Sequence, residues 1–232
     1  MTIQTTSYPA VEAHRSAASL PSNEALLRRR LLAVLETPVE PLRLTYDEFL
    51  AWADEDTLAE WVDGEVIMTS PASRQHQTIA DFLLKVMGTI AENRQLGVVI
   101  SAPFQMKIER SGREPDVMFV ANEHLDRFRE NHLEGPADLV VEIISPESIG
   151  RDRGEKFTEY EAAGVPEFWL IDPLRRWSEV YRLEEGRFHP IFSDASGICH
   201  SQSLPGFWLR MEWLWQSPPP QLLDVLAELE IV

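Results

Sequence analysis

The feature that most constrains this chain is a nearly unbroken aliphatic run at residues 138–144. Such a run is typical of a strand that is buried on both faces of a central sheet. One acid, Glu142, interrupts it between two valines and two isoleucines. An ionised carboxylate in apolar surroundings is costly unless a positive charge neutralises it. Glu142 therefore indicates either a sheet end that faces a cation or lysine, or a buried structural pair with an arginine.

The elements around this strand predict an α/β (α+β) fold, with a mixed central β-sheet flanked by helices. The predicted helices cover 45–52, a long amphipathic segment containing Ile79 to Ile90, 152–163 and 221–229. The predicted strands cover 98–108, 114–120, 138–144 and 167–171, with hairpins within 60–69 and across 177–193.

Prolines near both ends divide the chain into three parts. Residues 1–41 are expected to form a flexible N-terminal arm with a short helix. Residues 42–216 would form the folded domain, and 217–232 a proline-rich link followed by a C-terminal helix. Within the arm, Arg28–Arg30 is the densest basic run, which indicates either a solvated helix face or a nucleic-acid contact.

Composition excludes several classes of protein. With 44% hydrophobic and 25% charged residues, the chain is typical of a globular protein and not of a disordered one. A single cysteine, Cys199, excludes an intramolecular disulfide and a zinc knuckle. No apolar run is long enough to span a bilayer or to act as a signal peptide, so we expect a cytoplasmic protein without a membrane partner. The net charge of −17 is unlike the basic surface of a non-specific nucleic-acid binder.

Two more residues are expected to join Glu142 in one site. Asp116 lies in the preceding predicted strand, and Lys156 lies on the following predicted helix. The helical spacing puts Asp152, Lys156 and Tyr160 on one face, which can turn toward Glu142. Two carboxylates and a lysine suit magnesium-assisted phosphodiester hydrolysis, because carboxylate oxygens bind hard cations and an ammonium group stabilises developing negative charge.

With these residues in place, the sequence resembles the Uma-type restriction endonuclease family of the PD-(D/E)XK nuclease superfamily. The matching segments are Glu60–Glu65, Ser70–Ser73 with His76, Pro115–Val117, Pro136–Pro146, then Asp152, Lys156 and Tyr160, and Gly164–Pro173. The resemblance implies a restriction-endonuclease-like core. It also implies an endonuclease that cleaves DNA with Mg²⁺, or with Mn²⁺ in its place.

The resemblance also assigns roles to individual residues. Asp116 and Glu142 would hold the metal, with the main-chain carbonyl of Ile143 as an additional ligand. The superfamily often places its lysine two residues after the glutamate, but Ile144 occupies that position here. In this family the lysine has moved to the following helix, so Lys156 would take the catalytic role.

Further residues are candidates for the surroundings of the metal. The resemblance gives Glu60 a catalytic role, since it matches an early acidic position that completes the metal site through water. His76 is either a packed or capping histidine or a contact to the substrate phosphate. Tyr160 is either a packing residue or a hydrogen-bond donor to phosphate. Arg151 and Arg153 are the candidate phosphate contacts beside the site.

Three functions stay open at this point. The leading hypothesis is a magnesium-dependent DNA endonuclease acting as a homodimer. A catalytically inactive binding or assembly protein on the same fold is the alternative, since the net charge of −17 disfavours binding of a polyanion. A carboxylate-based glycosidase is the third, and the apposed Lys156 weakens it. Binding of Mg²⁺ or Mn²⁺ would separate the first function from the other two.

Overall fold

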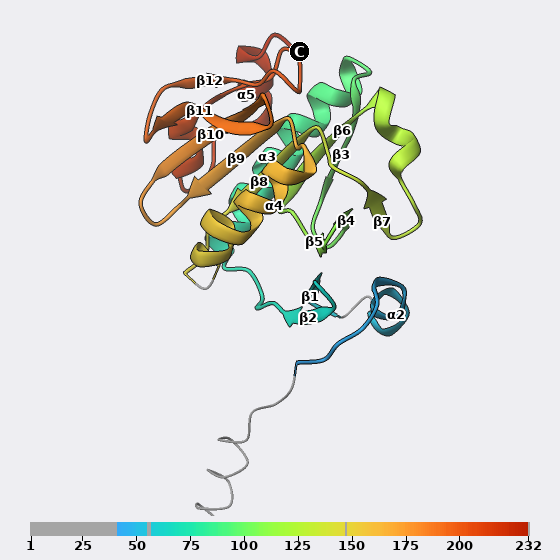
Figure 1. Cartoon of the computed structure of the whole chain (residues 1–232). Helices are drawn as coiled ribbons and strands as arrows, with labels where there is room; N and C mark the ends of the chain where they lie inside the picture. The colour runs from blue at the N-terminus through green and yellow to red at the C-terminus, as the bar shows by residue number, and fades with distance from the viewer. Residues whose placement is uncertain (1–40, 55–56, 147, 232) are drawn as a thin grey trace, which may run out of the picture. The chain divides into compact units, whose positions relative to one another are not determined.

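A computed structural model describes residues 41–54, 57–146 and 148–231 (Figure 1). Except for Pro41, the predicted N-terminal arm and its short helix lie outside these residues. Leu42–Val232 forms one compact unit, which contains every helix and strand described below.

A six-stranded mixed sheet lies at the centre, with the strand order β11-β10-β9-β8-β6-β3. Its strands are β3 (Gly97–Ser101), β6 (Val117–Ala121), β8 (Leu139–Ile143), β9 (Glu167–Asp172), β10 (Trp177–Glu184) and β11 (Arg187–Asp194). Strands β8 and β9 are parallel, and the other neighbouring strands are antiparallel. The predicted mixed sheet is therefore confirmed.

A second sheet of five strands has the order β2-β1-β5-β4-β7. Its strands are β1 (Ala59–Val62), β2 (Glu65–Met68), β4 (Gln105–Ile108), β5 (Ser111–Arg113) and β7 (His132–Glu134). The predicted hairpin at 60–69 is formed by β1 and β2. Its turn residues Asp63 and Gly64 both have positive φ, 49° and 88°, as the tight turns favoured in two-residue hairpins require.

The four predicted helices are present as α2 (Tyr46–Trp52), α3 (Arg74–Asn93), α4 (Lys156–Ala163) with η2 (Arg151–Glu155) directly before it, and α5 (Leu222–Glu228). Two short helices, η1 (Asn122–Arg127) and η3 (Met211–Trp215), were not predicted. A short pair of strands, β12 (Ile198–His200) and β13 (Trp208–Arg210), precedes η3. Thr45 and Glu48 form the capping box that begins α2. Gly164, with φ 83°, ends α4. No helix in the described stretches combines the length and apolar character that crossing a membrane requires.

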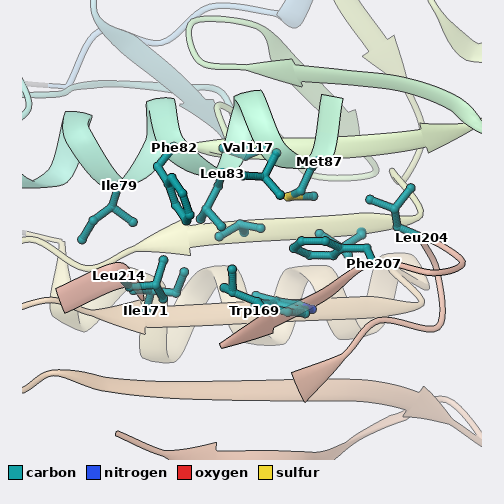
Figure 2. Packing of buried hydrophobic residues seen from close by; sticks show 14 of the residues in the cluster. Ile79, Phe82, Leu83, Met87, Val117, Trp169, Ile171, Leu204, Phe207 and Leu214 are labelled. Atoms are coloured by element: carbon teal, nitrogen blue, oxygen red, sulfur yellow. The ribbon is translucent and has the colours of Figure 1, made fainter. Parts of the chain in front are cut away.

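The six-stranded sheet is covered on both faces, and the two faces carry alternate residues of each strand. One face packs against α3 and the C-terminal segment; there the side chains of α3 point toward Val117, Trp169 and Ile171 (Figure 2). The other face, with Val140 and Phe168, packs against Tyr160 of α4. Even-numbered residues of β8 lie on the α4 face, which fixes the direction of Glu142.

The predicted strand 98–108 is wrong as a single element. It is β3 and β4, which belong to different sheets and are separated by a segment that contains Pro103. The predicted strand 114–120 begins too early, because residues 114–116 lie outside the strands and β6 begins at Val117. Proline has no N–H to donate to a strand ladder, and both Pro103 and Pro115 lie where the chain passes from one sheet to the other.

Candidate active site

Glu142, near the end of β8, lies among the polar side chains of α4. Its Oε2 atom accepts a hydrogen bond from Nζ of Lys156 at 2.9 Å, and its Oε1 atom accepts one from the hydroxyl of Tyr160 at 2.6 Å. Burial raises the pKa of Glu142 well above its ordinary value, and the charge of Lys156 opposes this rise. Of the two interpretations of Glu142, the structure supports the one in which it faces a lysine.

Lys156 is only 6% exposed and contacts three carboxylates. Besides Glu142, its ammonium group lies 3.1 Å from Glu60 and 3.7 Å from Asp152. Burial alone would lower the pKa of Lys156, but these carboxylates raise it above its ordinary value. The ammonium group is therefore charged at neutral pH, although it is buried.

Glu60, on β1, is held by two cations from different elements. One of its oxygens lies 3.0 Å from Nη1 of Arg113, and the other accepts a hydrogen bond from the N–H of Glu114 at 3.2 Å and contacts Lys156. Burial would raise the pKa of Glu60, but Lys156 and Arg113 outweigh it and lower the pKa to about 2. Both carboxylate oxygens are thus engaged within the protein.

Arg113 is a site residue that the sequence analysis missed. It is fully buried on β5, and it donates hydrogen bonds to Glu159 of α4 from Nε at 2.8 Å and from Nη2 at 2.6 Å. It therefore connects β5 both to Glu60 on the neighbouring strand β1 and to the helix that carries Lys156. No short-range pattern marks such a residue, because its partners are far away in the sequence.

Asp116 immediately precedes β6 and lies beside Glu142. The antiparallel register pairs Val117 with Val141, so the next pair outward is Asp116 and Glu142, on the same face of the sheet. Oδ2 of Asp116 accepts a hydrogen bond from the N–H of Ile143 at 2.6 Å. The two predicted carboxylates and the main chain of Ile143 are therefore brought together.

His76 lies in the first turn of α3, where Ser73 is the N-cap. Its Nε2 atom lies 3.2 Å from Oδ2 of Asp116. Burial lowers the pKa of His76, but the hydrogen bond and charge of Asp116 outweigh this effect and raise it. Nδ1 is buried and has no hydrogen-bond partner among the described residues. The ring thus lies at the site, where it contacts Asp116 and the main chain of Ile143.

The predicted phosphate contacts fall into two groups. Arg151 lines the same cavity as Asp116, and its Nε atom has no hydrogen-bond partner in the described part of the chain. Arg153 instead lies 2.7 Å from Glu179 and is not among the residues that line the cavity, so its contact with substrate stays a prediction. Of the two interpretations of Tyr160, its geometry favours packing, because the side chain is fully buried and its hydroxyl donates to Glu142.

The candidate site forms a cavity of about 660 Å³. Its acidic lining consists of Glu60, Glu114, Asp116, Glu142 and Asp152. Glu114 was also missed by the sequence analysis; it accepts a hydrogen bond from Gln105 at 3.4 Å. Burial is the main cause that raises the pKa of Glu114 to about 7.

The oxygen-rich lining of this cavity fits a hard divalent cation, although with few protein ligands. Among the described residues, no group of three or more His, Cys, Asp and Glu side chains is arranged to hold a metal ion. Asp116 and Glu142 would therefore supply two carboxylates, and Mg²⁺ typically binds one or two carboxylates and keeps several waters. Oδ1 of Asp152 is buried there without a hydrogen-bond donor, which adds an unsatisfied acceptor to the same cavity.

Three comparisons with known proteins show what this chain is similar to. The Uma2 family, described as "Putative restriction endonuclease", matches residues 46–212. An uncharacterized protein of Synechocystis sp. is 28% identical over 150 residues, covering 61% of this chain and 78% of that protein. A crystal structure from Anabaena variabilis, described as "a putative nuclease belonging to DUF820", matches with a TM-score of 0.64 and 18% identity. That match covers 74% of this chain and 97% of the other, and it shows a shared fold.

Proposed function

The chain belongs to the Uma2 family, and from this premise we propose that it is a metal-dependent endonuclease that hydrolyses DNA phosphodiester bonds. The observation that carries the proposal is the convergence of Asp116, Glu142 and Lys156 on one cavity. Mg²⁺ is the proposed cofactor, with Mn²⁺ as a substitute. Cleavage would proceed by in-line attack of water on phosphorus.

Asp116 and Glu142 would hold the metal, with the carbonyl of Ile143 as a candidate third ligand. When bound, a divalent cation neutralises charge on the phosphate and polarises a phosphoryl oxygen. The acidic lining supports the need for such a cation. Five carboxylates line the cavity, against the cations Lys156 and Arg151 and the titratable His76, so a polyanion would otherwise be repelled.

Lys156 would stabilise the negative charge that develops on the phosphoryl oxygens during cleavage. A preorganised cation is effective in this role because it needs no reorientation during the reaction. Three carboxylates hold the ammonium group and keep it protonated. Its contact with Glu142 also puts the charge directly beside a proposed metal ligand.

Glu60 and His76 would act through the residues they contact. Both oxygens of Glu60 are engaged with Arg113, Lys156 and the main chain, which favours a role in positioning Lys156 over a role as a metal ligand. His76 would orient Asp116 through its Nε2 atom. A direct contact of His76 with the substrate phosphate, and the homodimer, stay predictions.

The test is a plasmid-nicking assay with the purified chain and the Asp116→Asn variant. We expect nicking with Mg²⁺ or Mn²⁺, none with a chelator, and a loss of at least about 100-fold in the variant, because a metal ligand and a positioned charge are removed together. Nicking that persists in the chelator, or in the variant at the wild-type rate, would refute the proposal. Absence of cleavage of both the plasmid and a single-stranded oligonucleotide, with either metal, would favour the alternative of a catalytically inactive binding protein.

A further inference from the structure

The charged and uncharged residues that line the cavity differ in how deeply they are buried. Among its described residues, every charged side chain is buried or half-buried, from Glu142 and Asp152 to Asp116 and Arg151. Every exposed residue of the lining is uncharged, and these are serines, glutamines, prolines, alanines and three larger apolar residues. The cavity thus has a charged floor and an uncharged mouth.

The three larger residues of the mouth are Leu58, Met68 and Leu174. They come from different parts of the chain: the segment before β1, the last residue of β2, and the loop after β9. Met68 is 63% exposed and Leu174 67%, while Leu58 is 37% exposed. Large apolar side chains gathered in the open around a cavity are typical of a binding surface.

We infer that this mouth takes the bases of an unstacked nucleic-acid strand, so that the site acts on single-stranded nucleic acid; this inference rests on the proposed function. The floor offers Lys156 and Arg151 to one phosphate. The bases on either side of that phosphate would then pack against Leu58, Met68 and Leu174.

Charge favours a single strand over a duplex as the occupant. Affinity for duplex DNA comes largely from cations that contact its phosphates, and the exposed part of this mouth presents none among the described residues. The net charge of −17 makes long-range attraction to a duplex weaker still.

The shape of the nucleic acid leads to the same conclusion. In a duplex the base faces are stacked on one another, and apolar side chains reach them only by opening a base step at a cost in free energy. In a single strand the faces are accessible and pack on protein surfaces with little dependence on sequence. An uncharged mouth with exposed apolar side chains, above a recessed charged floor, therefore matches an unpaired strand.

The inference is tested by fluorescence anisotropy with a labelled single-stranded oligonucleotide and with the duplex made from it. The full chain is used with Ca²⁺ in place of Mg²⁺, and the same substrates are then followed for cleavage with Mg²⁺. The variant is Met68→Ser/Leu174→Ser. The matched control is Leu223→Ser, since Leu223 is 70% exposed on α5 and does not line the cavity.

We expect the single strand to bind at least about 10-fold tighter than the duplex. The double variant should lose about 10-fold in affinity for the single strand, since each partly exposed side chain contributes apolar area to the contact. The control should bind as the wild type does, and all three proteins should unfold at similar temperatures because the changed residues are exposed.

Equal or tighter binding of the duplex, unchanged binding by the double variant, or no binding of either nucleic acid would overturn the inference. Failure of the proposed function gives a different pattern. A wild-type chain that prefers the single strand through Met68 and Leu174 but cleaves nothing would support this inference and refute the endonuclease. Equal cleavage of strand and duplex would support the endonuclease and overturn this inference.

Discussion

At the scale of single residues, the lowered pKa of Glu60 should make the stability of the fold depend on pH. The pKa of Glu60 falls from the usual 4.5 to about 2, because Lys156 and Arg113 outweigh the cost of burial. A carboxyl group whose pKa is lower in the folded state stabilises the fold at any pH above the unfolded value. That contribution is lost as the pH falls from about 4.5 toward 2.

The Glu60→Gln variant should therefore lose about 3 kcal/mol of unfolding free energy at pH 7. Its stability should also depend less on pH than that of the wild type between pH 5 and pH 2.5. Urea unfolding at several pH values measures both effects. If the difference between the two proteins stayed constant down to pH 2.5, the low pKa of Glu60 would be wrong.

Some residues of the site could be predicted from their immediate neighbours, and others could not. Glu142 is conspicuous because a carboxylate within an aliphatic strand needs a partner, and Lys156 follows on the next helix. Arg113 gives no such signal, since its burial depends on Glu60 and Glu159 from distant elements. The two interpretations of Tyr160 stayed open because sequence spacing gives its helix face but not the inward direction of its hydroxyl.

At the scale of elements, periodicity predicted the long helices and the paired strands well. It failed around Pro103, where one predicted strand is two strands of different sheets, and around Pro115, where β6 begins only at Val117. Short strands such as β7 and β12 were not predicted, because three residues are too few to show an alternation. The turn of π-helix, η2, that precedes α4 likewise has no simple sequence signal.

Arg113 provides a test of how the elements are joined. It links β5 to β1 through Glu60 and to α4 through Glu159, without any exposure to solvent. The Arg113→Met variant should lose roughly 3–5 kcal/mol of unfolding free energy, because Glu60, Glu155 and Glu159 all lose their contact with this buried cation. Arg113→Lys should recover only part of this loss, since an ammonium group cannot reproduce the paired guanidinium contacts.

The matched control for Arg113 is Arg110→Ala. Arg110 lies in the turn between β4 and β5 and pairs with Asp63, but both side chains are largely exposed. Removing it should cost no more than about 1 kcal/mol. Equal losses in Arg113→Met and Arg110→Ala, measured by urea unfolding, would contradict the connecting role of Arg113.

At the scale of the whole molecule, the site exists only because two sheets meet beside one helix. Asp116 and Glu142 come from the six-stranded sheet, Glu60 comes from the five-stranded sheet, and Lys156 of α4 contacts carboxylates from both. The sequence analysis predicted a mixed central sheet but not the separate second sheet. It therefore named Asp116, Glu142 and Lys156, but it missed Arg113 and could not predict that Glu60 engages Lys156 and Arg113 with both oxygens.

The central claim is that Lys156 supplies the positive charge of a metal-dependent phosphodiesterase site. The most direct measurement is single-turnover cleavage by the Lys156→Met variant, beside its Mn²⁺ affinity and its thermal unfolding. Methionine keeps much of the side-chain volume and removes the charge. We predict a loss of roughly 10²–10³-fold in cleavage rate, as for other preorganised electrostatic groups, with the fold and Mn²⁺ binding retained. Cleavage at the wild-type rate by a folded, Mn²⁺-binding Lys156→Met protein would contradict the account.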